Sequence, residues 1–138
     1  MIGLDTNVLA RYYVQDESDN QAARQHEAAR RLIESGHALQ VCKTVLLELE
    51  WVLRGYYGFV PEDIARVLGH LCTLPQITVE DRDAVLRALS GIEVGLDFAD
   101  SLHHASSTAC VSMASFGDRT CARRAARLGL APPVLVPK

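Results

Sequence analysis

The segment Met1-Ile2-Gly3-Leu4-Asp5-Thr6-Asn7-Val8-Leu9 opens the chain and predicts how the rest of it folds. Ile2 to Leu4 is a short apolar run that ends at an aspartate, and the residues from Thr6 to Tyr13 have helical spacing. A strand followed by one aspartate and then directly by a helix is typical of α/β proteins with parallel sheets. Such sheets bind ligands beyond the carboxyl ends of their strands, so Asp5 is the first candidate functional residue.

Short strands and helices alternate along the remaining sequence. We expect helices at residues 21–34, 44–57, 61–71, 81–94, 97–109 and 119–128, and strands at 39–42, 77–79, 111–116 and 134–136. This order predicts an α/β fold with a parallel sheet and helices on both faces.

Length and composition fit one compact domain, residues 1–138. The chain is 49% hydrophobic, has no linker-like segment, and has no apolar run near the ~20 residues of a membrane span. Its start lacks the pattern of a signal peptide, so we expect a cytoplasmic protein without membrane contact. The four cysteines show no metal-binding spacing and are expected to be buried thiols. A net charge of −3 gives no general attraction to nucleic acid.

Aspartates occur where the predicted sheet would place chemistry. Asp118 follows the strand expected at 111–116, as Asp5 follows the first strand. Asp97 and Asp100 are three residues apart at the start of a predicted helix, which puts both on one face. Each could simply cap a helix, because aspartate is favoured at helix N-termini. Capping does not readily explain four such residues.

Two glutamates lie in the most apolar predicted helix. Glu50 has Arg54 four residues later, the favourable order for a surface ion pair. Glu48 has mainly apolar neighbours, and a carboxylate in such surroundings needs a partner or a metal ion. Glu48 is therefore the functional candidate of the two.

Several carboxylates gathered at one sheet edge would repel one another unless a cation neutralised them. Oxygen ligands alone favour Mg²⁺ or Mn²⁺ over Zn²⁺. A bound ion of this kind would lower the pKa of a water molecule and stabilise charge on a phosphate. The acids thus point to phosphodiester hydrolysis without a side-chain nucleophile.

Four segments together resemble the PIN-domain ribonucleases, especially the VapC-type toxins of bacterial toxin–antitoxin pairs. They are residues 1–9, 46–53 (Leu-Leu-Glu-Leu-Glu-Trp-Val-Leu), 97–102 (Asp-Phe-Ala-Asp-Ser-Leu) and 115–119 (Ser-Phe-Gly-Asp-Arg) followed by 122–125. They occur in the family's order over nearly the whole chain. The family usually has an acid directly after the phenylalanine of the fourth motif, where this chain has Gly117. Asp118 takes that part if the loop shifts by one residue.

The resemblance implies a PIN-like three-layer α/β/α fold with a central parallel sheet of about five strands. It implies a Mg²⁺-dependent endoribonuclease that cuts single-stranded RNA, commonly in structured RNAs such as tRNA. It also implies a homodimer and inhibition by a cognate antitoxin protein.

The resemblance also assigns roles to particular residues. Asp5, Asp100 and Asp118 would hold the metal ion with help from Asp97, and Glu48 would hold it or orient the attacking water. Thr6, Asn7 and Ser115 would position these acids or a phosphate through hydrogen bonds.

Basic and aromatic residues are candidates for RNA contacts. Arg119, Arg123 and Arg127 share one face of the helix expected after Asp118 and could bind phosphates, although a solvated helix face would look the same. Five aromatic residues could stack bases, line a dimer face or belong to the core: Tyr12, Tyr13, Trp51, Tyr56 and Tyr57.

Other functions remain as alternatives. The chain could be a catalytically weak PIN-like binding module. It could also be a phosphatase with Asp5 as nucleophile, but that chemistry needs a second acid at position 7, which is asparagine, and a nearby lysine. A serine hydrolase and a nucleoside triphosphatase are disfavoured because the Gly-x-Ser-x-Gly turn and the phosphate-binding loop are both missing.

Overall fold

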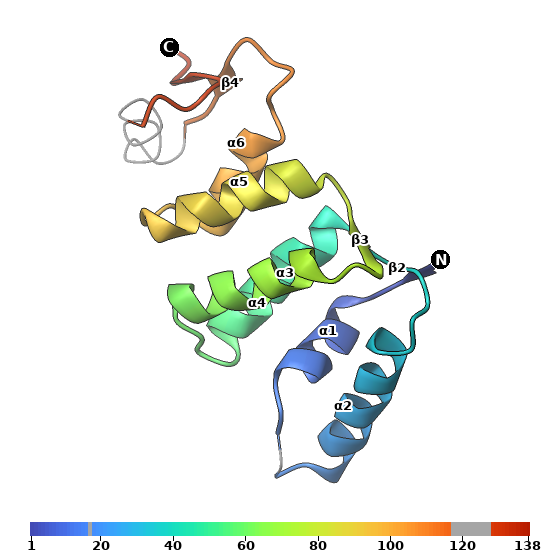
Figure 1. Ribbon diagram of the computed structural model, residues 1–138. Coiled ribbons are helices and arrows are strands. Elements are labelled where there is room, and N and C mark those ends of the chain that lie inside the picture. The colour runs from blue at the N-terminus through green and yellow to red at the C-terminus, as the bar shows by residue number, and fades with distance from the viewer. Residues whose placement is uncertain (17, 117–127) are drawn as a thin grey trace. The chain divides into compact units, whose positions relative to one another are not determined.

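The computed structural model describes residues 1–16, 18–116 and 128–138. The chain divides into two compact units, Met1–Arg82 and Asp83–Lys138, which we treat separately. The described part is mixed α/β, with six helices and parallel strands (Figure 1).

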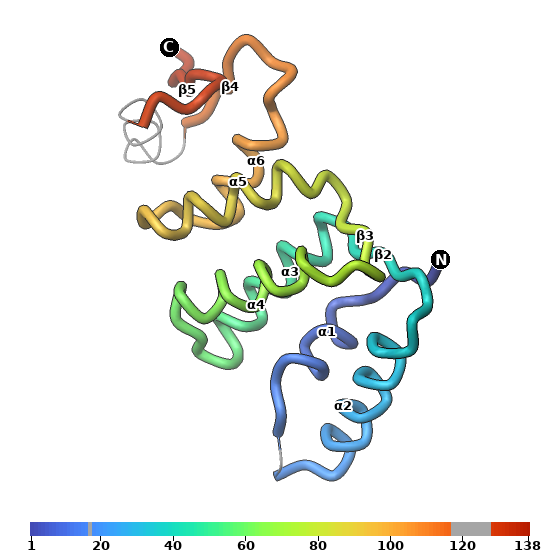
Figure 2. The backbone as a smooth tube through the Cα atoms, viewed as in Figure 1, coloured from blue at the N-terminus to red at the C-terminus, as the bar shows by residue number. Residues whose placement is uncertain are grey.

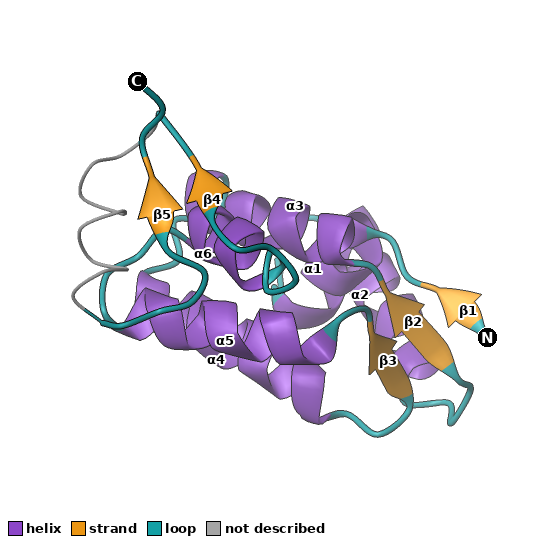
Figure 3. Ribbon diagram, turned by 90° about the horizontal axis from the view of Figure 1, so that it is seen from above, coloured by secondary structure: helices purple, strands orange, loops and turns teal. Residues whose placement is uncertain are grey.

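The first unit contains three strands and four helices: β1 (Ile2–Gly3), α1 (Thr6–Tyr13), α2 (Asn20–Ile33), β2 (Leu39–Val41), α3 (Lys43–Gly55), α4 (Pro61–Thr73) and β3 (Ile77–Val79). The strands form a parallel sheet in the order β1-β2-β3 (Figure 3). Ile2 pairs with Leu39, and Leu39 pairs with Ile77. Parallel pairing requires a crossover connection, and here each connection between neighbouring strands contains two helices.

The core of the first unit forms from one apolar stripe on each helix. Leu39 and Val41 of β2 are fully buried while Gln40 between them is exposed. Leu46, Leu49 and Leu53 repeat at helical spacing along the buried face of α3. Helices α1 and α2 contact each other and run in opposite directions, as the tube in Figure 2 shows. This packing holds the carboxyl end of β1 against the start of α1.

The second unit contains α5 (Arg82–Glu93, whose first residue belongs to the first unit), α6 (Phe98–Ala105), β4 (Met113–Ala114) and β5 (Val134–Leu135). Strands β4 and β5 pair in parallel. A glycine lets α5 and α6 approach closely, because a Cβ at Gly91 would lie 2.6 Å from the Oγ atom of Ser101. Phe98, Leu102 and Ala105 form the buried face of α6, as expected.

The expectation of one sheet of about five strands is wrong for the described residues. The five strands form a three-stranded and a two-stranded sheet, and the second lies wholly in the second unit. The apolar runs identified the strands one by one, but strand pairing depends on how the folded chain brings them together. These strands are two or three residues long, so each pairing involves few hydrogen bonds.

Two smaller expectations also need correction. Helix α6 ends at Ala105 rather than 109, and Ala109 is exposed. Cys72 is buried, but Cys42 and Cys110 are exposed because they lie at the N-cap of α3 and in the turn after α6. No described helix combines the length and the apolar character that crossing a bilayer would require.

Candidate functional site

A pocket of about 380 Å³ opens beside the carboxyl end of β1, entirely within the first unit. We call it the acidic pocket. Its lining combines carboxylates, amide and hydroxyl groups, one arginine and aromatic rings: Asp5, Thr6, Asn7, Ala10, Arg11, Asp16, Asp19, Glu48, Trp51, Val52, Tyr56 and Tyr57. It therefore contains four of the predicted site residues.

Asp5 joins β1 to α1 and caps the helix. Its Oδ1 atom accepts a hydrogen bond of 2.8 Å from the backbone N–H of Thr6, and the side chain remains exposed. The alternative that Asp5 caps a helix is thus correct for one of its two carboxylate oxygens, Oδ1. The bond orients the carboxylate without burying it, so a capping role and a ligand role are compatible.

Glu48 lies on α3 and is exposed at the acidic pocket. The expectation that it sits among apolar groups is wrong. Glu50 is the buried one, at 7% exposure, and its Oε1 atom accepts a 2.8 Å hydrogen bond from Nε of Arg54. The predicted ion pair is confirmed, although its carboxylate is not at the surface. Glu50 continues the buried stripe of Leu46, Leu49 and Leu53, and Glu48 lies off that stripe.

Thr6 and Asn7 follow Asp5 into the first turn of α1. The side chain of Thr6 is buried, and its Oγ1 atom has no hydrogen-bond partner among the described residues. Asn7 is exposed at the pocket. An unpartnered buried hydroxyl is uncommon in folded proteins and often has a functional explanation.

Sequence reasoning missed Arg11, Asp16 and Asp19 as pocket residues. Arg11 is half-buried one turn beyond Asn7, a spacing that could have revealed it, and its Nε atom donates to Oε1 of Gln25 at 2.8 Å. Asp19 caps α2 by accepting from the backbone N–H of Gln21. The hydroxyl and backbone N–H of Ser18, and then the charge of Arg11, lower the pKa of Asp16.

The oxygen groups of the acidic pocket have the chemistry that a hard divalent cation requires. Within the described ranges, no three acidic, histidine or cysteine side chains are close enough to form a metal-binding group. Mg²⁺, however, commonly binds through one or two carboxylates and completes its shell with water and substrate phosphate. Asp5 and Glu48 fit that pattern, because both carboxylates are exposed at the same pocket.

The second unit holds the next pair of predicted acids. Asp97 caps α6 through a 3.0 Å hydrogen bond from the backbone N–H of Asp100 to its Oδ1 atom. Both side chains are exposed, as expected for residues on one helix face. Capping thus accounts for one oxygen of Asp97, as it does for Asp5.

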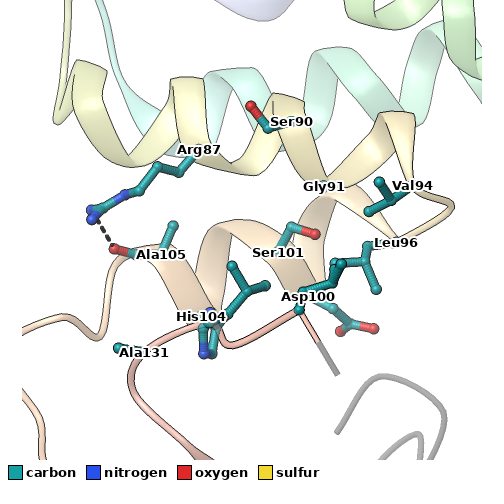
Figure 4. A pocket seen from close by; sticks show the side chains of 12 residues that line it. Arg87, Ser90, Gly91, Val94, Leu96, Asp100, Ser101, His104, Ala105 and Ala131 are labelled. Atoms are coloured by element: carbon teal, nitrogen blue, oxygen red, sulfur yellow. Dashed lines mark hydrogen bonds between the residues drawn. The ribbon is translucent and has the colours of Figure 1, made fainter. Parts of the chain in front are cut away.

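Asp100 also lines a pocket of about 330 Å³, whose walls are mostly apolar (Figure 4). In this view its carboxylate points away from α5, while the Ser101 hydroxyl lies on the side of Gly91. His104 contributes to the same wall, but its Nε2 atom is bonded to the backbone oxygen of Pro132 at 2.6 Å. That bond gives His104 a structural role and disfavours it as a metal ligand.

The fourth predicted motif is described only in part. Ser115 is half-buried, and its backbone N–H donates to the oxygen of Leu135 at 2.9 Å, which extends the pairing of β4 with β5. Asp118, Arg119, Arg123 and Arg127 lie outside the described residues, and their proposed roles stay predictions.

Comparison with known proteins adds no family assignment, because the sequence matches no family model and no curated protein. The acidic pocket itself is therefore the basis for any functional conclusion.

Proposed function

We propose that this protein is a Mg²⁺-dependent endoribonuclease with a PIN-like three-layer fold, acting as the cytoplasmic toxin of a toxin–antitoxin pair. The observation that carries the proposal is the shared pocket of Asp5 and Glu48, which lie in separate segments of the sequence. Mn²⁺ is the alternative ion, since it also prefers oxygen ligands.

A divalent ion bound there would supply positive charge to the phosphate and lower the pKa of a water molecule. The protein's own groups would position the reactants. Asp5, oriented by the N–H of Thr6, holds one side of the site. The exposed carboxylate of Glu48 accepts a hydrogen bond from the attacking water and directs it at phosphorus. The water oxygen would form a bond to phosphorus and release a proton to solvent, while the bond to the leaving oxygen breaks and that oxygen takes up a proton from solvent.

The remaining roles follow the sequence resemblance and are part of the proposal. The resemblance assigns Asp97, Asp100 and Asp118 the role of further metal ligands, and Ser115 that of positioning these acids or a phosphate. The arginines at 119, 123 and 127 bind RNA phosphates. A homodimer and a cognate antitoxin complete the expected set of partners.

The test is to incubate the purified protein with total RNA, with and without Mg²⁺, and to map the cut ends. Cleavage should need the cation, and Asp5→Asn and Asp100→Asn should each reduce its rate at least ~100-fold. Glu62→Gln is the matched control, because Glu62 is an exposed acid at the start of α4, outside the acidic pocket.

Cleavage that persists without divalent ions, or that Asp5→Asn and Glu62→Gln affect equally, would refute the nuclease proposal. RNA binding without turnover would favour the binding module. A phosphorylated Asp5 would favour the phosphatase.

A further inference from the structure

One wall of the acidic pocket is aromatic. Trp51, Tyr56 and Tyr57 line it, and we call them the aromatic wall. Trp51 is 61% exposed and Tyr56 is 78% exposed, unusually high values for such large apolar groups. Tyr57 is half-buried and supports Tyr56 through an edge-to-face contact with ring centroids 4.8 Å apart.

The aromatic wall continues the face of α3 that carries Glu48. Trp51 lies three residues after Glu48 on α3, which places the two side chains on the same side of the helix. Tyr56 follows as the C-cap residue. A ligand that reaches Glu48 and Asp5 therefore passes beside exposed ring faces.

We propose that the aromatic wall stacks the bases next to the phosphodiester bond that is cut, so that Trp51 and Tyr56 position the RNA. This inference rests on the proposed function. Aromatic side chains stack on nucleobases without regard to sequence, and a strand must be unpaired for its bases to do so. Arg11 lines the same pocket and supplies a positive group for the backbone of that strand.

A second copy of the chain is the rival occupant of the aromatic wall. Docking an apolar surface there would also cover the exposed carboxylates of Asp5 and Glu48, which share the pocket. Removing these charges from water without partners is costly. A nucleic-acid strand avoids this cost, because its bases cover the rings while its phosphates share a cation with the acids.

Trp51 is the sole tryptophan of the chain, so fluorescence excited at wavelengths that tyrosine does not absorb reports on the aromatic wall. The Asp5→Asn variant, which should not cut RNA, is titrated with a short single-stranded RNA and with an abasic strand of equal length. Stacking predicts that the RNA quenches the fluorescence of Trp51 and that the abasic strand, which has no bases, changes it little. The two strands carry the same phosphates, so a difference between them is due to the bases.

Substitutions then separate stacking from folding. In the Asp5→Asn background, Trp51→Leu and Tyr56→Leu should each weaken the binding of labelled RNA about tenfold, and Trp51→Phe should restore most of it. Val60→Ala is the control, because Val60 is exposed in the first unit but does not line the pocket. In the wild-type background, Trp51→Leu should raise KM and leave kcat nearly unchanged.

The outcomes distinguish this inference from the proposed function. RNA cleavage without selective quenching would overturn base stacking and leave the nuclease intact. Selective quenching without any cleavage would support stacking and remove the nuclease. Emission that changes with protein concentration and is unaffected by RNA would overturn the inference by showing a contact between copies.

Discussion

The hydroxyl of Thr6 is buried beside Asp5, and it has no hydrogen-bond partner among the described residues. A hydroxyl in that state costs about 1–3 kcal/mol of stability. Thr6→Val removes the hydroxyl with little change of shape, so the free energy of unfolding should stay level or rise. RNA cleavage should fall, because the proposed role of Thr6 is to position the neighbouring acids through hydrogen bonds from this hydroxyl.

Denaturant unfolding and cleavage rates, measured on the same preparations, check this prediction. Thr6→Ser is the matched control, since it keeps the hydroxyl and should retain most activity. A loss of more than about 1 kcal/mol in Thr6→Val would show instead that the hydroxyl has a structural partner.

Glu48 and Glu50 show how far residue-level reasoning reaches. The i, i+4 spacing of Glu50 and Arg54 was enough to predict their ion pair. The apolar neighbours of Glu48 in the sequence wrongly suggested apolar surroundings for its side chain. Successive side chains on a helix point about 100° apart, so sequence neighbours face different directions. The stripe that became buried includes Glu50 and leaves Glu48 at the acidic pocket.

Helices α1 and α4 are joined by a polar contact between Tyr13 and His70. The Tyr13 hydroxyl and the Nδ1 atom of His70 are 2.8 Å apart, and the rings meet edge to face. Burial, followed by the influence of Tyr12 and Cys72, raises the pKa of Tyr13 well above its usual value. The folded state therefore favours the protonated phenol more than the unfolded state does.

This contact predicts a pH dependence of stability. Because the pKa of Tyr13 is higher in the folded state, Tyr13 contributes fully to the free energy of unfolding below the unfolded pKa of about 10. This contribution is lost as the pH rises from there toward the folded-state pKa. Tyr13→Phe should thus show a smaller loss of unfolding free energy in alkali than the wild type. Denaturant titrations from about pH 8 to pH 11 measure it, with exposed Tyr56→Phe as control. Parallel curves for wild type and Tyr13→Phe would contradict the assignment.

Most elements were predictable because their signals are local. The helix at Thr6–Tyr13 and the strand at Ile77–Val79 have the predicted bounds, and Gly36 and Gly58 adopt the positive φ angles expected just past helix ends. The end of α6 was missed, since the apolar spacing continues to Ala109 although the helix stops at Ala105. Periodicity identifies a possible helical face but does not show where packing against it ends.

For the whole molecule, the proposed ion should couple to stability. A ligand that binds only the folded state stabilises it by mass action, by about 2.7 kcal/mol at a hundred times its dissociation constant. Mg²⁺ should therefore raise the Tm of the protein by several degrees. Asp5→Asn should abolish most of that rise, and Glu62→Gln should preserve it.

Thermal unfolding at constant ionic strength tests the coupling, with Na⁺ replacing Mg²⁺ as the reference. Since the chain carries a net charge of −3, any salt relieves some general repulsion, and the reference removes that effect. An equal rise in wild type and Asp5→Asn would show that Mg²⁺ acts by screening alone.

Local sequence patterns were enough to predict most strands and helices, the possible caps at Asp5 and Asp97, and the Glu50–Arg54 ion pair. These features depend on groups a few residues apart, where backbone geometry sets the distance. The pairing of the described strands as two sheets, and the meeting of Arg11 and the aromatic wall with Asp5 and Glu48 at one pocket, became visible only in the folded chain. Such arrangements depend on which surfaces are buried when distant segments pack, and no local pattern encodes that choice.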